Sequence, residues 1–242
     1  MIKAQGVTNT IFYIMYIWNR KYLQTKLSKN KMNSTGFIKR INALSKKYEK
    51  LVVAIDGYSA AGKTTLLKKF EKDNKNVLAV FMDDFILTGK GRGQSIKKAK
   101  DKSKVFELDW YDYKKIKTLI KEFRAKNKGY YKTKIYNSDT DKIDILKKFD
   151  LSKNILVIEG IFLFHPKLFK NMFDIKVFLD IGLAYADKRR VRRERKRWGK
   201  EYISEDSPNS WTNLFKIAYK RYLKEYSPKK QADIVIKTTK GE

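Results

Sequence analysis

The chain has 242 residues, of which 42% are hydrophobic, so it can bury the core of one α/β domain of good size or of two small ones. It contains no cysteine and one histidine, His165, which excludes disulfide bonds, cysteine-based zinc sites and multi-histidine metal sites and fits a reducing cytoplasm. The formal net charge of +30 favours polyanionic partners such as nucleic acid, but the lysines are spread along the whole chain, as in a nucleotide-binding enzyme of lysine-rich composition.

Residues 1–31 differ in composition from the rest of the chain. The segment Thr10–Trp18, TIFYIMYIW, is apolar but too short to span a bilayer, and the basic start and cleavage site of a secretory signal are not evident. Met32 is a second candidate start, and apolar residues at helical spacing follow it from Phe37 to Leu44. We expect residues 1–31 to be a dispensable leader; the alternative is an interfacial helix with basic residues behind the apolar patch.

A phosphate-binding loop is the most specific motif in the sequence. The apolar run Leu51–Ile55 predicts a buried strand, and Gly57–Thr64, GYSAAGKT, follows it and fits G-x-x-x-x-G-K-[ST] at every fixed position. A helical pattern comes next, so that backbone N–H groups and the helix dipole would both face a bound phosphate. We expect Lys63 to contact the β- and γ-phosphates and Thr64 to hold Mg²⁺. The complete predicted phosphate site comprises Gly57, Ser59, Ala60, Ala61, Gly62, Lys63, Thr64 and Thr65.

Carboxylates follow two further predicted strands. Val77–Phe81 predicts a buried strand that runs into Asp83, and Ile155–Ile158 predicts another that ends at Glu159. Ligands bind at the carboxyl ends of strands in open α/β sheets, so we expect both side chains near the nucleotide, with Glu159 directed toward the metal. The alternatives are a helix cap or turn for Asp83 and a solvated strand end for Glu159.

Two long segments between these strands carry no core pattern. Residues 88–104 hold three glycines among lysines and one arginine, which predicts a mobile basic loop. Asp109 precedes an amphipathic helical pattern and could cap it. Residues 127–154, which include Tyr136, are polar and aromatic and suggest an insertion; we find no hairpin signal in the sequence.

The last third of the chain contains the densest cationic run. Val177–Leu179 predicts a fourth strand, and Asp187–Trp198, DKRRVRRERKRW, follows it. Arg189, Arg193 and Arg197 are four residues apart and would share one helix face, from which they could close over a polyphosphate. The alternatives are a solvated helix face or contact with RNA. A helical pattern from Trp211 to Tyr226 and a short strand, Ala232–Ile236, complete the chain.

These elements predict an α/β fold. Five apolar strands separated by helical patterns indicate a mostly five-stranded parallel sheet with helices on both faces, the three-layer sandwich of the P-loop NTPases. The motifs, in chain order, resemble the uridine kinase-like branch of P-loop kinases, which also includes nicotinamide riboside kinase, phosphoribulokinase and bacterial pantothenate kinase. The resemblance extends from about residue 51 to 236 and rests on GYSAAGKTT (57–65), MDDF (82–85), Asp109-Trp110, VIEGIF (157–162), the arginine-rich helix and ADIVI (232–236).

The resemblance implies a kinase domain over residues 32–242 that transfers a phosphoryl group from ATP or GTP to a hydroxyl group, with Mg²⁺. It implies an acceptor-binding insertion at about 86–150 and a lid at about 183–200, in which Arg189 and Arg193 would be catalytic. Asp83 matches the family's general base, Asp109 the aspartate that holds ribose hydroxyls, and Glu159 the metal-side glutamate.

Departures from the family pattern leave the acceptor open. The family's lid commonly carries an Arg-Asp pair, where this chain has Lys196-Arg197-Trp198, and uridine kinases place a histidine in the base pocket, where this chain offers Tyr136 in roughly the same insertion. The 5′-hydroxyl of uridine or cytidine is the best expectation. The alternatives are a related kinase with another acceptor, such as nicotinamide riboside or pantothenate, a nucleic-acid-binding P-loop ATPase, or a degenerate fold that only binds ligands. A homo-oligomer is also compatible with the family.

Overall fold

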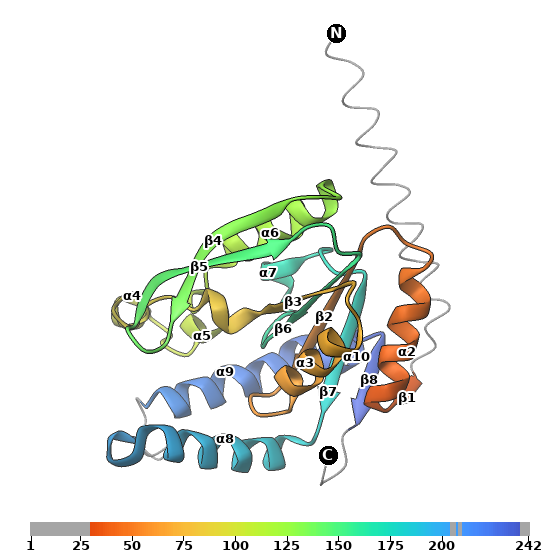
Figure 1. The fold of residues 1–242 in the computed structure, drawn as a ribbon. Coiled ribbons are helices and arrows are strands. Elements are labelled where there is room, and N and C mark those ends of the chain that lie inside the picture. Colours follow the sequence, from red (N-terminus) through yellow and green to blue (C-terminus); the bar gives the residue numbers. More distant parts are fainter. Residues whose placement is uncertain (1–29, 204–206, 208–209, 238–242) are drawn as a thin grey trace, which may run out of the picture.

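A single parallel sheet forms the centre of the protein. The computed structural model describes residues 30–203, 207 and 210–237. In this part of the chain six strands pair in parallel (Figure 1). Their order across the sheet is β1 (Asn30–Met32), β8 (Ile234–Lys237), β7 (Ile175–Asp180), β2 (Leu51–Gly57), β6 (Ile155–Glu159) and β3 (Val77–Phe81).

Five of these strands are the ones predicted from the sequence, and the sixth, β1, is an addition. The prediction placed Asn30 and Lys31 in the leader, but their backbones pair with Ile234 and Val235 of β8. Periodicity could not detect a strand of only three residues at the edge of a sheet. The apolar segment at 10–18 and the basic residues behind it lie outside the described residues.

Successive side chains of each strand point to opposite faces of the sheet and pack into two separate cores. Val53 and Ile55 of β2 face one helical layer, formed by α2 (Ser34–Ser45) and α3 (Lys63–Asp73). Val52 and Ala54 face the other layer, which contains α5 (Lys104–Leu108), α6 (Tyr113–Ala125) and α9 (Trp211–Tyr226). A sheet buried on both faces needs apolar residues at consecutive positions, which is the pattern of these strands. The predicted α/β sandwich is therefore confirmed.

The remaining elements connect or flank these strands and helices. They are η1 (Met82–Phe85), α4 (Gly89–Lys98), β4 (Tyr130–Asn137), β5 (Lys142–Asp150), α7 (Pro166–Phe169), α8 (Leu183–Trp198), η2 (Gly199–Glu201) and α10 (Pro228–Gln231). Figure 1 shows α8 running alongside α9 below the sheet, and the β4–β5 hairpin on the opposite side. Within the described ranges, no helix has the length and apolar character needed to cross a membrane.

The prediction of a mobile loop over residues 88–104 is wrong for its first part, because α4 occupies Gly89–Lys98. Thr88 caps this helix by accepting a hydrogen bond from the Gly91 N–H at 3.2 Å. Asp141, which lies 52 residues further along the chain, accepts from the Gly89 N–H at 2.7 Å and 2.9 Å. Two caps on the first turn outweigh the low helix propensity of three glycines.

The segment at 127–154 forms a β-hairpin, which the sequence analysis did not predict. β4 and β5 pair antiparallel from Tyr130↔Asp150 to Asn137↔Lys142, and the register shifts between Ile135 and Tyr136. Ile135 and Phe149 point toward the protein and are buried, whereas Tyr130 on the outer side is 59% exposed. The register shift interrupts the period of two, so the alternation is difficult to read from the sequence.

Candidate functional site

The phosphate loop leaves the sheet at the end of the central strand β2. A side chain at Gly57 would place its Cβ 2.7 Å from the backbone oxygen of Leu179, so only glycine fits beside β7. Gly62 has a φ of 96°, and it forms the turn from the loop into α3. The N-terminal turn of α3, with its unpaired N–H groups and positive dipole end, therefore starts where a phosphate would lie.

Lys63 is hydrogen-bonded to the backbone of the loop. Its Nζ donates to the backbone oxygens of Gly57 and Tyr58, both at 3.0 Å, and its side chain is buried. Burial lowers the pKa of Lys63, and the nearby carboxylate of Glu159 opposes this shift. The ammonium group replaces hydrogen bonds to carbonyls easily with bonds to phosphate oxygens, because both are acceptors.

Thr64 and Glu159 form an oxygen pair at the end of β6. The Thr64 hydroxyl donates to Glu159 Oε1 at 2.8 Å. Burial raises the pKa of Glu159, and the charge of Lys63 acts in the opposite direction. A hydroxyl and a carboxylate are ligands that suit Mg²⁺, which normally completes its octahedron with phosphate oxygens and water. The two side chains thus fit the predicted metal position.

Asp83 lies on η1, at the carboxyl end of β3, with an exposed side chain. Its charge contributes to the pKa shifts of both Lys63 and Glu159, so the three groups share one edge of the sheet. The Tyr111 hydroxyl donates to Asp83 Oδ1 at 3.4 Å. Asp84 is engaged elsewhere, since Lys147 of β5 donates to it at 2.7 Å. Of the two neighbouring aspartates, Asp83 is the one available to a substrate.

Asp56 is a buried carboxylate that the sequence analysis missed. It precedes the phosphate loop, accepts from the Gly57 N–H at 2.6 Å and accepts from the Tyr222 hydroxyl of α9 at 2.5 Å. The Phe164 N–H also lies 3.3 Å from it. Burial raises its pKa from 3.8 to about 6, although these hydrogen bonds and Lys63 act against the shift. The sequence did contain a signal for Asp56, since it is a charged residue at the end of an apolar run, directly before Gly57.

Of the two lid arginines predicted to be catalytic, one reaches the phosphate loop. Arg193 Nη2 donates to Ser59 Oγ at 2.9 Å. Arg189 is exposed, lies 5.9 Å from the ring centre of Tyr185, and makes no contact with the loop among the residues described. The neighbouring Arg190 is buried instead, which the four-residue spacing did not indicate.

Tyr136 joins an aromatic group around the guanidinium of Arg92 on α4. Its hydroxyl donates to Asp141 at 3.0 Å, and its ring centre lies 5.6 Å from the guanidinium carbon. The same carbon lies 5.0 Å from the ring centre of Trp110 and 5.1 Å from that of Trp211. Within the described chain, Arg92 Nε is buried and has no hydrogen-bond partner. Rings and a spare donor together could recognise a flat, polar ligand.

Asp109 does not contact Asp83. It lies at the C-terminal end of α5, its side chain is exposed, and it forms no side-chain hydrogen bond to any described residue. The connection between the two aspartates is indirect: Tyr111, two residues after Asp109, donates a hydrogen bond to Asp83.

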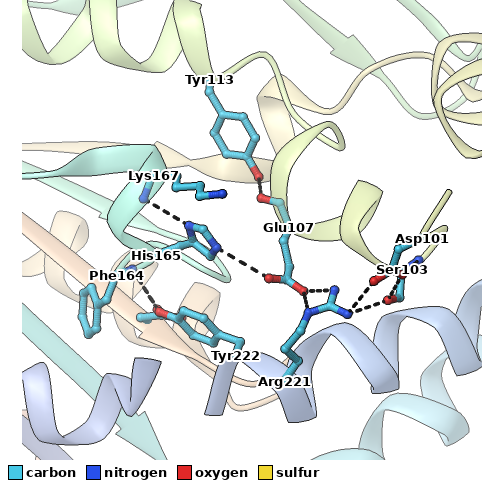
Figure 2. A network of polar contacts seen from close by, with 10 residues as sticks. Asp101, Ser103, Glu107, Tyr113, Phe164, His165, Lys167, Arg221 and Tyr222 are labelled. Carbon is cyan, nitrogen blue, oxygen red and sulfur yellow. Dashed lines mark hydrogen bonds and ion pairs between the residues drawn. The ribbon is translucent and has the colours of Figure 1, made fainter. Parts of the chain in front are cut away.

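A buried polar network fixes α5, which leads into Asp109 (Figure 2). The Glu107 carboxylate accepts from Arg221 Nε of α9 at 2.8 Å, and His165 Nε2 lies 3.6 Å from its other oxygen. Burial lowers the pKa of His165 to about 4, so this side chain is neutral at pH 7. The Tyr113 hydroxyl donates to the Glu107 backbone oxygen at 2.7 Å. These contacts hold α5 against α9 and against the segment that follows β6.

The chain is similar to known kinases. A uridine kinase of Staphylococcus haemolyticus (strain JCSC1435) is 30% identical over 84 residues, which is 35% of this chain and 39% of that protein. The match thus spans about two fifths of the curated relative.

Two solved structures have the same fold. One, described as a possible uridine kinase from Bacillus stearothermophilus, is 23% identical with a TM-score of 0.58 and covers 82% of this chain and 97% of its own. A D-glycerate 3-kinase from Cryptococcus neoformans is 14% identical with a TM-score of 0.54 over 82% of this chain and 87% of its own.

The sequence profile of the Phosphoribulokinase / Uridine kinase family matches residues 52–241, which is most of the chain. The matched region begins in β2, includes the phosphate loop, η1 and the arginine-rich helix, and extends past β8. The resemblance recognised from the motifs is thereby confirmed, and the chain belongs to the Phosphoribulokinase / Uridine kinase family of P-loop kinases.

Proposed function

We propose that the protein is an ATP-dependent kinase that transfers the γ-phosphoryl group to a hydroxyl of a nucleoside-like acceptor, with the 5′-hydroxyl of uridine or cytidine as the first candidate. One observation carries the proposal: the Lys63 ammonium group, the Thr64–Glu159 oxygen pair and the exposed carboxylate of Asp83 lie at one edge of the sheet. GTP is the alternative donor.

In the proposed reaction Asp83 acts as the general base. A sugar hydroxyl is a poor nucleophile, so a carboxylate within hydrogen-bond reach would orient it and accept its proton as the oxygen bonds to the γ-phosphorus. The bond from that phosphorus to the β–γ bridging oxygen breaks, and ADP leaves. Tyr111 donates to Asp83 at 3.4 Å and would orient the carboxylate.

Charge on the transferring group is balanced by the phosphate loop. Lys63 and the N-terminal turn of α3 would bind the β- and γ-phosphate oxygens. Thr64 and Glu159 would hold Mg²⁺, which supplies electrostatic stabilisation of the phosphate charge. Arg193, already beside Ser59, is placed to reach the same oxygens when the lid closes.

The expectation of a nucleoside-like acceptor rests on the group around Arg92. Trp211, which is 45% exposed, and Tyr136 could stack with a base beside the Arg92 guanidinium. Trp110 is buried and stacked on Phe106, so it would support this group from behind. Asp109, exposed on the same segment as Trp110, could accept from ribose hydroxyls. The uridine kinase from S. haemolyticus supports this acceptor, and nicotinamide riboside or pantothenate remain alternatives.

A nucleic-acid-binding ATPase is the second candidate, and the exposed cationic face of α8 favours it. Lys188, Arg192 and Arg195 line an open cavity there of about 340 Å³, and a basic surface of this kind attracts phosphate backbones. Such an enzyme would have no use for a free carboxylate at Asp83.

The test is a product assay with Mg·ATP against nucleosides, vitamin precursors, RNA and DNA, read by product mass. A nucleoside that gains one phosphate supports the kinase and names the acceptor. Release of inorganic phosphate that requires nucleic acid would overturn the proposal. The Asp83→Asn variant separates the two functions, because it should abolish transfer to a hydroxyl and leave nucleic-acid-stimulated hydrolysis unchanged.

A further inference from the structure

The phosphate loop is joined directly to the arginine-rich helix α8 through a variable position of its motif. The Tyr58 hydroxyl donates to Asp187 Oδ1 at 2.7 Å, across 129 residues of sequence. Asp187 lies in the second turn of α8, which begins at Leu183. The loop motif leaves this position unspecified, so no general requirement of phosphate binding explains a tyrosine there.

Asp187 is also held from its own helix and from α9. Arg190 Nη2 donates to Asp187 Oδ1 at 2.8 Å and Arg190 Nε at 3.2 Å, and Lys216 Nζ lies 3.5 Å from Oδ2. The Arg190 side chain is only 4% exposed. Burial would raise the pKa of Asp187, but the hydrogen bonds from Tyr58 and Arg190 lower it overall, so the carboxylate stays ionised.

Aromatic packing fixes the position of the Tyr58 ring. Its ring centre lies 4.6 Å from that of Tyr219 and 5.7 Å from that of Phe215, both on α9. Burial raises the pKa of Tyr58, so the hydroxyl keeps its proton and remains a donor to Asp187. Tyr58, Asp187 and Arg190 thus form a rigid contact between the loop, α8 and α9.

A second contact lies further along α8 and is of a different kind. Arg193 donates to Ser59, the residue after Tyr58, and its side chain is 56% exposed. Six residues separate Asp187 from Arg193, which is about 9 Å along a helix axis. A partly buried contact and an exposed contact therefore join consecutive loop residues to successive turns of the same helix.

We propose that Tyr58, Asp187 and Arg190 are positioning residues that form the fixed pivot of α8, so that Arg193 can leave Ser59 and swing onto the phosphates of a bound nucleotide. The proposal rests on the proposed function, because it assumes that phosphates bind in the loop. Tyr58 itself would not touch the reacting atoms. It would set where the helix starts its movement and how far Arg193 must travel.

Two tyrosines in the same aromatic cluster provide a matched pair of variants. Tyr58→Phe removes the hydroxyl that bonds to Asp187 and keeps the ring. Tyr219→Phe removes a hydroxyl that is buried but has no hydrogen-bond partner in the described structure. Both changes have the same size and chemistry, so a difference between them reports the Tyr58–Asp187 bond and not general damage to the cluster.

The kinetic experiment measures kcat and KM for ATP and acceptor in these variants, in Asp187→Asn and in the Tyr58→Phe/Asp187→Asn double variant. We expect Tyr58→Phe to lower kcat roughly tenfold with little change in either KM. A fall of this size corresponds to the loss of one hydrogen bond to a charged group. The double variant should lose little beyond the worse single variant. Equal kcat values in Tyr58→Phe and Tyr219→Phe would overturn the proposal.

Amide hydrogen exchange of the nucleotide-free protein tests the pivot without any turnover. Tyr58→Phe should speed exchange across 187–198, while Tyr219→Phe should leave that segment as in the wild type. If Tyr58→Phe speeds exchange but the wild type transfers no phosphoryl group, the Tyr58–Asp187 contact is supported and the proposed function is rejected. Unchanged exchange in an active enzyme would reject the pivot and retain the kinase.

Discussion

The two sides of the proposed site, one for the nucleotide and one for the acceptor, are built in different ways. The phosphate loop and the start of α3 are one continuous stretch that leaves a strand buried at the centre of the sheet. The acceptor side brings together η1, α4, the segment 109–111 and the hairpin, which are held by contacts between distant residues. Asp84 bonds to Lys147 across 63 residues, and Gly89 bonds to Asp141 across 52. A short motif can specify the first arrangement, whereas the second depends on the folded chain.

This difference suggests that substitutions at the phosphate loop and at the acceptor side fail in distinct ways. If the proposed function holds, substitutions in the loop should affect nucleotide binding and turnover with every acceptor equally. Substitutions in the hairpin and α4 should affect the choice and affinity of the acceptor and leave nucleotide binding unchanged.

The largest expected effect is that of Lys63→Ala. Loss of the ammonium group removes a buried donor at the position of the β- and γ-phosphates, so phosphoryl transfer should fall by at least about a thousandfold for every acceptor. Steady-state kinetics check this, with circular dichroism to show that the fold is kept. Lys69→Ala, an exposed lysine of the same helix α3, is the control and should retain wild-type turnover. Near-normal activity of Lys63→Ala would remove the phosphate-loop assignment.

The next largest effect is expected for Asp83→Asn, because Asp83 lies where the nucleotide side and the acceptor side of the proposed site meet. The amide cannot take the acceptor's proton, so kcat should fall by about a hundredfold to a thousandfold while the Kd for ATP stays the same. Asp84→Asn is the control. It should weaken the contact with Lys147 and raise the acceptor KM, with a much smaller effect on kcat. If Asp84→Asn loses more turnover than Asp83→Asn, the base is Asp84.

The residues of the nucleotide side could be chosen from the sequence because most of them form one contiguous motif, and because Glu159, 95 residues after Thr64, ends a recognisable parallel strand. Five strands, the glycine turn and the Thr64–Glu159 pair follow from local patterns and from the rule that parallel strands end at one edge. Sequence prediction failed where distant residues decide the local structure: α4 forms because Asp141 caps it, and the hairpin carries a register shift that hides its alternation. Helix spacing alone could not tell that Arg190 is the buried arginine of α8 and that Arg193, not Arg189, contacts the loop.

Asp56 shows a further limit of sequence patterns. An aspartate at the end of an apolar strand looks like a loop residue, and only the approach of Tyr222 and the Phe164 N–H, both more than 100 residues away in the chain, makes a fully buried carboxylate tolerable there. These partners also connect the start of the phosphate loop to α9, and Phe164 adjoins the His165–Glu107 contact on the acceptor side (Figure 2).

The third prediction concerns pH and this carboxylate. Burial raises the pKa of Asp56 from 3.8 to about 6, so between these values the folded protein binds one proton more than the unfolded chain. The free energy of unfolding contributed by this group should therefore be highest below about pH 4 and fall as pH rises to 6, by at most about 3 kcal/mol. Urea unfolding of the wild type and of Asp56→Asn from pH 4 to 7 measures it.

The difference between the two proteins isolates Asp56 from the other raised carboxyl groups, such as Glu159 and Asp84. Wild type should lose stability relative to Asp56→Asn as pH rises through the window. Asp73→Asn, an exposed change on α3, should show no such trend. A wild-type minus Asp56→Asn difference that is constant with pH would show that Asp56 stays ionised in the folded protein.

The smallest effect is expected for Tyr136→Phe, and this variant tests most directly whether the hairpin acts on the acceptor alone. The change keeps the ring beside Arg92 and removes the hydroxyl, which donates to Asp141 at 3.0 Å and accepts a long hydrogen bond from Arg92 Nη2 at 3.4 Å. The acceptor KM should rise by no more than about fivefold, because one exposed hydrogen bond and one long one contribute little, and the KM for ATP should not change. Tyr130→Phe, on the exposed outer side of the same strand, is the control. A rise in the KM for ATP would mean that the hairpin serves the nucleotide, and the division between the two sides of the site would be wrong.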